Sequence, residues 1–291
     1  MRRSLLFLPG NNPGMLGNGD TLDADGIILD LEDAVAPNEK DAARILVRNA
    51  LQTLHYKACE IIVRINGLDT SYWQDDLEAI ISAGPDIIMP TKVSGADYIH
   101  ELAAKITAVE KSCGMEIGKT KILPLLETAV GVENAYPIAI ADKRIIGLFL
   151  GAEDLTADLR CKRTKEGQEI FYARTRLVMA ARAAGVDAYD TPFTDANDLE
   201  GLRKDAILAR SLGFSGKTAI NPRHIDCINE VFSPSQADIE YAKEVFAAIE
   251  EGKKLGKGAV ALRGKMIDKP IVARAQQVLD AAKAIYGGDI L

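Results

Sequence analysis

Short runs of apolar residues recur along the chain and alternate with longer amphipathic stretches. Eight runs are long enough to form strands: residues 4–9, 26–31, 60–65, 86–90, 121–126, 144–150, 187–193 and 216–220. Several of these runs are continuously apolar, which is typical of strands buried on both faces of a parallel sheet. Between the runs, residues 39–54, 95–112 and 169–185 place apolar side chains three and four positions apart, which predicts helices.

Eight alternations of strand and helix predict an α/β fold of the (β/α)8 TIM barrel type. The alternative is an open, doubly wound sheet, which would need a nucleotide-binding fingerprint that the sequence lacks. Two further helical patterns, 235–256 and 269–286, exceed what an eighth barrel helix requires. We therefore predict a catalytic barrel over residues 1–233. Residues 234–291 should form a C-terminal helical extension that packs on the barrel, on a neighbouring subunit, or on both.

Polar residues lie at the carboxyl ends of the predicted strands or directly after them. Because the carboxyl ends of barrel strands share one mouth, where active sites of this fold lie, we expect these side chains to meet there. They are Asp30, Glu32, Asp33, Arg64, Asn66, Lys92, Glu127, Glu153, Asp154, Asp190 and Asn221.

Glu127 and Asp154 follow the fifth and sixth strands, and two carboxylates that meet are natural ligands for a hard cation such as Mg²⁺. Of the neighbours Glu153 and Asp154, we expect Asp154 to be the ligand. The alternative is that these acids only stabilise the start of the following helices. Arg64 lies within a buried strand and needs an anionic partner, either the neighbouring carboxylates or a substrate. Asp30 and Asp33 are equally consistent with a role in orienting other groups.

The composition excludes several classes of protein. A net charge of −7 over 291 residues argues against a general nucleic-acid binder, because phosphate neutralisation needs a basic surface. The four cysteines are scattered without CxxC spacing, which indicates reduced thiols and no zinc site. The apolar stretch at 5–8 is too short for a signal peptide, and no run approaches the roughly 20 apolar residues of a membrane span. We therefore expect a cytoplasmic protein.

Familiar enzyme motifs built on histidine or serine are also missing. The three histidines do not cluster in the sequence and no GxSxG is present, so a histidine metal site or a Ser-His-Asp triad is not indicated.

Longer motifs carry a resemblance to a known family. LPGNNPGML, DLEDAV, VRING, PLLETAVG, GAEDLTADL, KRTKEGQEIFYAR, GFSGKTAINPRHID and GKMIDKPIVARAQ lie between about residues 2 and 283. Together they resemble the citrate lyase β subunits, within the wider family of malyl-CoA and citramalyl-CoA lyases and HpcH/HpaI aldolases. KRTKEGQEIFYAR is the segment that points to citrate lyase in particular.

The resemblance implies a (β/α)8 barrel and cleavage of a citryl thioester to oxaloacetate and an acetyl thioester. The family's Mg²⁺ ligands match Glu127 and Asp154, and its carboxylate-binding arginine matches Arg64. An aspartate supplied by a neighbouring subunit matches Asp268, which implies a homo-oligomer. Partners implied by the resemblance are an acyl-carrier (γ) subunit and an α transferase subunit. The chain reads Pro90-Thr91-Lys92 where Pro-Lys is expected, so no role follows for Lys92.

Three other functions are compatible with these residues. The first is a stand-alone lyase for malyl-CoA, citramalyl-CoA or a similar thioester. The second is a non-catalytic subunit that keeps the barrel for binding, against which the intact Arg64, Glu127 and Asp154 argue. The third is a class II aldolase that acts on free hydroxy acids.

Overall fold

Nine parallel strands form the central sheet of the computed structural model, which describes residues 1–254 and 260–287. The strands are β1 (Ser4–Pro9), β2 (Gly26–Asp30), β3 (Glu60–Arg64), β4 (Ile87–Met89), β5 (Lys121–Ile122), β6 (Leu125–Leu126), β7 (Gly147–Leu150), β8 (Asp187–Asp190) and β9 (Gly216–Ala219). Seven predicted runs each contain one strand. The run 121–126 contains two, interrupted at Leu123-Pro124, because proline has no N–H to donate to a neighbouring strand.

The order of the strands closes them into a ring. The first strand, β1, lies between β2 and the last strand, β9, and the sheet ends at β5 and β6. These two ends belong to one stretch of chain: β5 pairs with β4, and β6 pairs with β7. A further parallel bridge joins Ile122 to Ile145. The predicted (β/α)8 barrel is therefore confirmed, and the open doubly wound alternative is wrong.

The inside of the barrel is a packed core. One cluster of buried side chains draws on most of the strands: Leu5, Ile28, Ile62, Ile87, Met89, Leu123, Leu125, Phe149 and Tyr189. Such filling by layers of branched and aromatic residues is general in this fold. The side chains of this core fill the described interior of the barrel, which leaves the ends of the strands as the part of the barrel where a ligand can bind.

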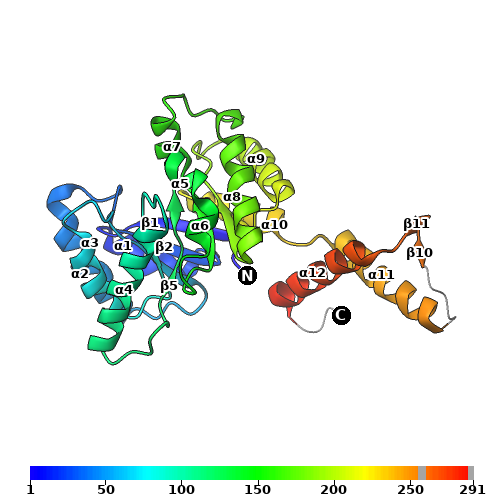
Figure 1. The fold of residues 1–291 in the computed structure, drawn as a ribbon, viewed down its shortest axis with the longest axis horizontal. Helices are drawn as coiled ribbons and strands as arrows, with labels where there is room; N and C mark the ends of the chain where they lie inside the picture. Colours follow the sequence, from blue (N-terminus) through cyan, green and yellow to red (C-terminus); the bar gives the residue numbers. More distant parts are fainter. Residues whose placement is uncertain (255–259, 288–291) are drawn as a thin grey trace. The chain divides into compact units, whose positions relative to one another are not determined.

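Helices surround the strands (Figure 1). They are α1 (Pro13–Asn18), α2 (Lys40–Thr53), α3 (Trp73–Ile81), α4 (Ala96–Ser112), α5 (Ala129–Glu133), α6 (Ala135–Ala139), α7 (Ala152–Asp158), α8 (Phe171–Ala184), α9 (Leu199–Leu212) and α10 (Ile225–Phe232). The three helices predicted between strands are confirmed as α2, α4 and α8, with ends shifted by at most two residues. In α2 the apolar face carries Ala43, Val47 and Ala50, all buried, which explains the spacing seen in the sequence.

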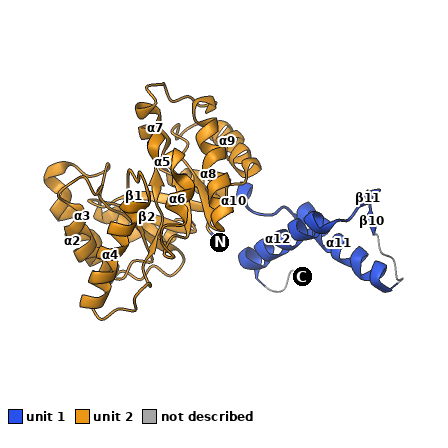
Figure 2. Ribbon diagram, viewed as in Figure 1, with its two compact units in different colours: residues 1, 230–291 blue, residues 2–229 orange. Residues whose placement is uncertain are grey.

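The chain divides into two units (Figure 2): residues 2–229, and residues 230–291 together with Met1. The division falls inside α10. The smaller unit contains α11 (Gln236–Lys254) and α12 (Lys269–Tyr286), which share a core of Ala242, Val245 and Ala275. Both helices correspond to predicted helical stretches, although residues 255 and 256 of the first stretch lie outside the described residues.

A hairpin between α11 and α12 was not predicted. Strands β10 (Ala261–Leu262) and β11 (Lys265–Met266) pair antiparallel, and the two residues between them both have positive φ, 51° at Arg263 and 77° at Gly264. Two positive φ values are what the tight turn of a two-residue hairpin requires. Within the described residues, no helix is long and apolar enough to cross a membrane.

Candidate active site

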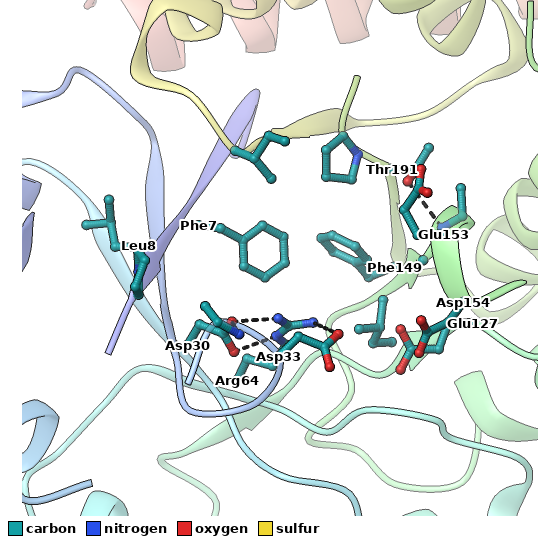
Figure 3. A pocket seen from close by; sticks show the side chains of 17 residues that line it. Phe7, Leu8, Asp30, Asp33, Arg64, Glu127, Phe149, Glu153, Asp154 and Thr191 are labelled. Atoms are coloured by element: carbon teal, nitrogen blue, oxygen red, sulfur yellow. Dashed lines mark hydrogen bonds and ion pairs between the residues drawn. The ribbon is translucent and has the colours of Figure 1, made fainter. Parts of the chain in front are cut away.

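A cavity of about 420 Å³ opens at the carboxyl ends of the strands (Figure 3). Residues at the ends of β1, β2, β3, β6 and β7 line it, together with residues that follow β8 and β9. The polar members of its lining are Asp30, Asp33, Arg64, Glu127, Glu153, Asp154 and Thr191, and the apolar members include Phe7, Leu125, Phe149 and Ile220. The expected meeting of strand-end side chains at one mouth is therefore found for most of the acids and for Arg64.

Glu127 and Asp154 lie side by side at this cavity (Figure 3). Glu127 directly follows β6, and Asp154 is in the first turn of α7, which follows β7. The neighbouring strands approach closely at Gly151, where a Cβ atom would lie 2.7 Å from the Cβ of Glu127. The absence of a side chain at Gly151 is what allows the two acidic segments to pack against each other.

Burial controls the charge of Glu127. Its side chain is buried, and this burial, with the negative charge of Asp154, raises the pKa of Glu127 to about 8. The backbone N–H of Lys92 donates to Oε1 of Glu127 at 2.8 Å and opposes this rise. A group held in this way is stabilised in its charged form by any cation that enters the site.

The adjacent acids Glu153 and Asp154 have different surroundings. The carboxylate of Glu153 is largely exposed and lies 3.7 Å from Nε of Arg163. Asp154 instead raises the pKa of Glu127, and its Oδ2 lies 3.6 Å from Nζ of Lys92. This geometry supports Asp154 as the acid that acts together with Glu127.

Arg64 is held on two sides. Its Nε and Nη2 donate to the two oxygens of Asp30 at 2.7 and 2.6 Å, and its Nη1 lies 3.1 Å from Glu32. The guanidinium carbon lies 4.9 Å from the ring centre of Phe7, which itself packs edge-on against Phe149. The bidentate contact with Asp30 (the fork) and the cation–π contact with the ring of Phe7 together fix the plane of the guanidinium. The carboxylates are thus the anionic partners that the buried strand position requires.

Lys92 has an unusual backbone. Its φ is +52°, a left-handed conformation that residues other than glycine rarely adopt. That turn aims its N–H at Glu127, while its Nζ lies 3.5 Å from Oε1 of Glu32 as well as near Asp154. Strained backbone of this kind persists where the surroundings fix it, and it concentrates at functional sites.

Three residues predicted for the mouth have other partners. Asn66 donates to Asp76 at 2.7 Å, and Asn221 accepts from the N–H of Arg223 at 3.0 Å. Asp190 is fully buried in an ion cluster behind the strand end. Among the described residues, the lining of the cavity includes none of these three. Within the same part of the chain it also lacks Glu32 and Lys92, which contact the lining residues Arg64 and Asp154 from beside the cavity. The prediction that all of these side chains line the mouth was wrong, because position at a strand end does not determine which way a side chain points.

Asp268 belongs to the C-terminal unit. There it precedes α12 and accepts a hydrogen bond from the N–H of Ile271 at 3.0 Å, as a helix-capping aspartate does. Its predicted catalytic role stays a prediction.

The donor set at the cavity fits Mg²⁺. Within residues 1–254 and 260–287, no group of three or more His, Cys, Asp or Glu side chains is arranged to hold a metal. Mg²⁺ is usually bound by one or two carboxylates, with water and substrate oxygens completing an octahedron. The pair of Glu127 and Asp154 matches that requirement, and the cavity lining carries five acidic side chains against one arginine.

Comparison with known proteins identifies the family. Residues 3–222 match the family model described as HpcH/HpaI aldolase/citrate lyase, and the chain belongs to this family. It is 47% identical over 284 residues to the citrate lyase subunit beta of Leuconostoc mesenteroides subsp. cremoris, covering 98% of this chain and 94% of that protein. The citrate lyase subunit beta of Haemophilus influenzae is 46% identical over 284 residues, which cover 98% of this chain and 98% of that protein. The resemblance to the citrate lyase β subunits is therefore confirmed, and with it the class of carbon–carbon lyases.

Solved structures agree with the fold. The CitE protein of Mycobacterium tuberculosis, in complex with magnesium, acetoacetate and coenzyme A, is 31% identical and superposes with a TM-score of 0.80, covering 97% of this chain and 98% of that one. A citrate lyase beta subunit of the same organism, complexed with oxaloacetate and magnesium, is 32% identical with a TM-score of 0.68, over 80% and 97% of the two chains.

The raised pKa of Glu127 predicts how the metal-free protein responds to pH. In the unfolded chain this carboxyl ionises near its ordinary pKa of 4.5, whereas in the folded chain it keeps its proton up to about 8. The folded state binds the extra proton between these values, so the free energy of unfolding should fall as the pH rises from about 5 to 8. The thermal midpoint in chelator, followed by circular dichroism, should fall further over this range for the wild type than for Glu127→Gln. Parallel curves for the two proteins would contradict the assignment.

Proposed function

We propose that this chain cleaves the central carbon–carbon bond of a citryl thioester, giving oxaloacetate and an acetyl thioester, with Mg²⁺ bound between Glu127 and Asp154. The observation that carries the proposal is the pairing of these two carboxylates in one cavity with the fixed guanidinium of Arg64. The relatives add support, because the most similar ones reported above are citrate lyase β subunits and two related structures hold magnesium.

The charge of the cavity explains why a cation is needed. A citryl group carries carboxylates, and an acidic cavity would repel them in the absence of a compensating positive charge. A divalent cation held by Glu127 and Asp154 would reverse the local field and so allow the anionic substrate to bind. Arg64, on the other side of the cavity, supplies a second positive charge.

The reaction is the reverse of a Claisen-type addition. The hydroxyl loses its proton, the carbon–carbon bond breaks as the ketone of oxaloacetate forms, and the electron pair passes to the thioester as an enolate that takes up a proton at carbon. When bound, Mg²⁺ would supply Lewis acidity that lowers the pKa of the hydroxyl. Arg64 binds a carboxylate or the thioester oxygen and stabilises the negative charge that develops, because a fixed guanidinium needs little reorganisation.

Asp268 is the proposed proton carrier of this reaction. The proposal places it in a neighbouring copy of the chain, so that the C-terminal unit of one subunit completes the mouth of another. A homo-oligomer is part of the proposal, as are an acyl-carrier (γ) subunit that presents the thioester and an α subunit that exchanges acetyl for citryl. We propose a cytoplasmic location for this assembly.

The metal ligands can be tested one at a time. Glu127→Ala and Asp154→Ala should each lower kcat/KM by more than about 100-fold, because loss of a ligand disrupts the metal site more than loss of its supporting groups does. Added Mg²⁺ should not restore activity, and circular dichroism should show an intact fold. Glu153→Gln is the matched control, since this neighbouring carboxylate is largely exposed and lies toward Arg163, and it should keep Mg²⁺ affinity within a few-fold of the wild type. Wild-type turnover by both alanine variants would refute the metal site.

Arg64→Lys tests the role of the fork. Lysine keeps the positive charge but cannot form the bidentate contact with Asp30 or lie flat on the ring of Phe7. We expect kcat/KM to fall on the order of 100-fold, the usual effect of losing one preorganised donor. Mg²⁺ affinity should change little. Near-normal steady-state kinetics would remove Arg64 from the mechanism.

Substrate assays separate the remaining alternatives. Citryl-CoA or citryl-acyl-carrier protein, (3S)-malyl-CoA and free citrate should be compared under the same Mg²⁺ concentration. Preference for the citryl thioester supports the proposal, and preference for malyl-CoA would favour the stand-alone thioester lyase. Cleavage of free citrate would indicate an aldolase, and no detectable binding of Mg²⁺ would favour a non-catalytic subunit.

A further inference from the structure

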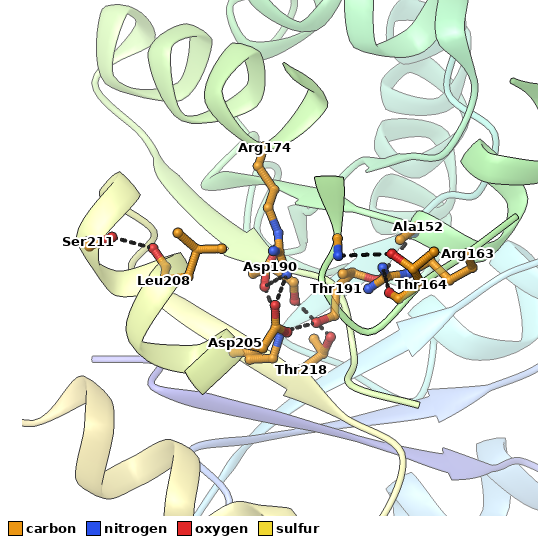
Figure 4. A network of polar contacts seen from close by, with 12 residues as sticks. Ala152, Arg163, Thr164, Arg174, Asp190, Thr191, Asp205, Leu208, Ser211 and Thr218 are labelled. Atoms are coloured by element: carbon orange, nitrogen blue, oxygen red, sulfur yellow. Dashed lines mark hydrogen bonds and ion pairs between the residues drawn. The ribbon is translucent and has the colours of Figure 1, made fainter. Parts of the chain in front are cut away.

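Four charged side chains from α8, β8, α9 and β9 form a cluster beside the carboxyl end of β8 (Figure 4). Arg174 of α8 donates to Asp190 twice at 2.9 Å and to Asp205 of α9 at 2.7 Å. Nζ of Lys217, on β9, lies 2.6 Å from each of the same two acids. All four side chains are buried, and their formal charges sum to zero.

Burying four charges is costly, and such clusters are often no more stable than apolar packing of the same volume. The hydrogen bonds from this region to the backbone at the end of β8 suggest a different role for the cluster. Nζ of Lys217 also donates to the backbone carbonyl of Thr191 at 2.7 Å, and the hydroxyl of Thr218 donates to the carbonyl of Asp190 at 2.9 Å. Two consecutive carbonyls at the end of β8 are therefore fixed by side chains of β9.

Thr191 connects this fixed strand end to the helix α7 at the cavity. Its hydroxyl oxygen accepts a hydrogen bond from the backbone N–H of Ala152 at 3.2 Å, and both residues are buried. Ala152 is the first residue of α7, and its N-cap, Gly151, cannot provide a side-chain cap. The start of α7 is thus capped by Thr191, the residue that directly follows β8.

The segment that Thr191 fixes is the one that carries Asp154. Asp154 lies two residues after Ala152, in the first turn of α7, and Gly151 packs directly against Glu127. A shift of this turn would change the separation of the two carboxylates. Thr191 lines the same cavity, so its hydroxyl anchors the turn from within the site.

We propose that Thr191 is a positioning residue of the metal site, held by Lys217, and that it sets the place of Asp154 relative to Glu127. The inference rests on the proposed function, because it concerns the same pair of carboxylates. Outer groups that orient metal ligands typically contribute 10- to 100-fold to metal affinity or activity. The hydroxyl of Thr191 acts through the backbone of α7 and has no direct role in the chemistry.

Two substitutions of Thr191 test the proposal. Thr191→Val keeps the shape of the side chain but removes the acceptor, whereas Thr191→Ser keeps the hydroxyl. Titration calorimetry with MgCl₂ alone on the full chain should show a dissociation constant raised about tenfold or more for Thr191→Val. Thr191→Ser should remain within about threefold of the wild type, and kcat/KM for the citryl thioester should follow the same order.

The controls distinguish positioning from general stability. Thr175→Val removes an exposed hydroxyl on α8 that donates to two carbonyls of its own helix, and this variant should leave Mg²⁺ affinity unchanged. The thermal midpoint in chelator reports the stability lost in each variant. Equal Mg²⁺ affinities for Thr191→Val and Thr191→Ser would overturn the proposal, even if the valine variant is less stable.

The role of Lys217 is tested by a double-mutant cycle. If Lys217 acts through Thr191, Lys217→Met should weaken Mg²⁺ binding, and combining it with Thr191→Val should add little more. Full additivity would exclude Lys217 from the proposal. If Lys217→Met does not fold, the two Thr191 variants still decide the part that concerns Thr191. Absence of saturable Mg²⁺ binding to the wild type would refute the proposed function, whereas normal wild-type binding with equal Thr191 variants would refute only this inference.

Discussion

The burial of the Glu127 carboxyl group beside the negative charge of Asp154 is the constraint on which the candidate site depends. Glu127 and Asp154 are brought together because β6 and β7 are adjacent. Gly151 has no side chain, which allows the segments that carry the two acids to approach closely. Burial makes the second negative charge so unfavourable that the pKa of Glu127 rises to about 8. A cation beside the pair would lower its free energy, and under the proposed function it would also offset the negative charges of the substrate.

Two separate networks hold the groups on opposite sides of this pair. On β2 and β3, the fork between Asp30 and Arg64 fixes a positive charge. On β8 and β9, Lys217 fixes Thr191, which caps the helix that carries Asp154. Both networks attach functional groups to strands and to the backbone beside them. Such support limits the reorganisation needed when charge develops during a reaction.

The fold was largely predictable, because strands buried on both faces produce apolar runs that stand out from amphipathic helices. The mouth position of Glu127, Asp154 and Arg64 followed from the rule that barrel strands share one carboxyl end. The orientation of single side chains did not follow. Asp190 points into the ion cluster although its neighbour Thr191 lines the cavity, because alternate residues of a strand face opposite sides. The hairpin in the C-terminal unit was missed because Arg263-Gly264 is not a typical turn pair.

The buried ion cluster shows why parts of a site cannot be read from local patterns. Lys217 lies within a predicted strand, and Arg174 within a predicted helix, where each would ordinarily be placed facing solvent. They are buried because each pairs with the same two carboxylates, which come from two other elements, β8 and α9. Apolar side chains could fill the same volume with less cost, but they could not bind the carbonyl of Thr191. The cluster is thus better explained by the geometry that it imposes on the neighbouring strand end than by its contribution to stability.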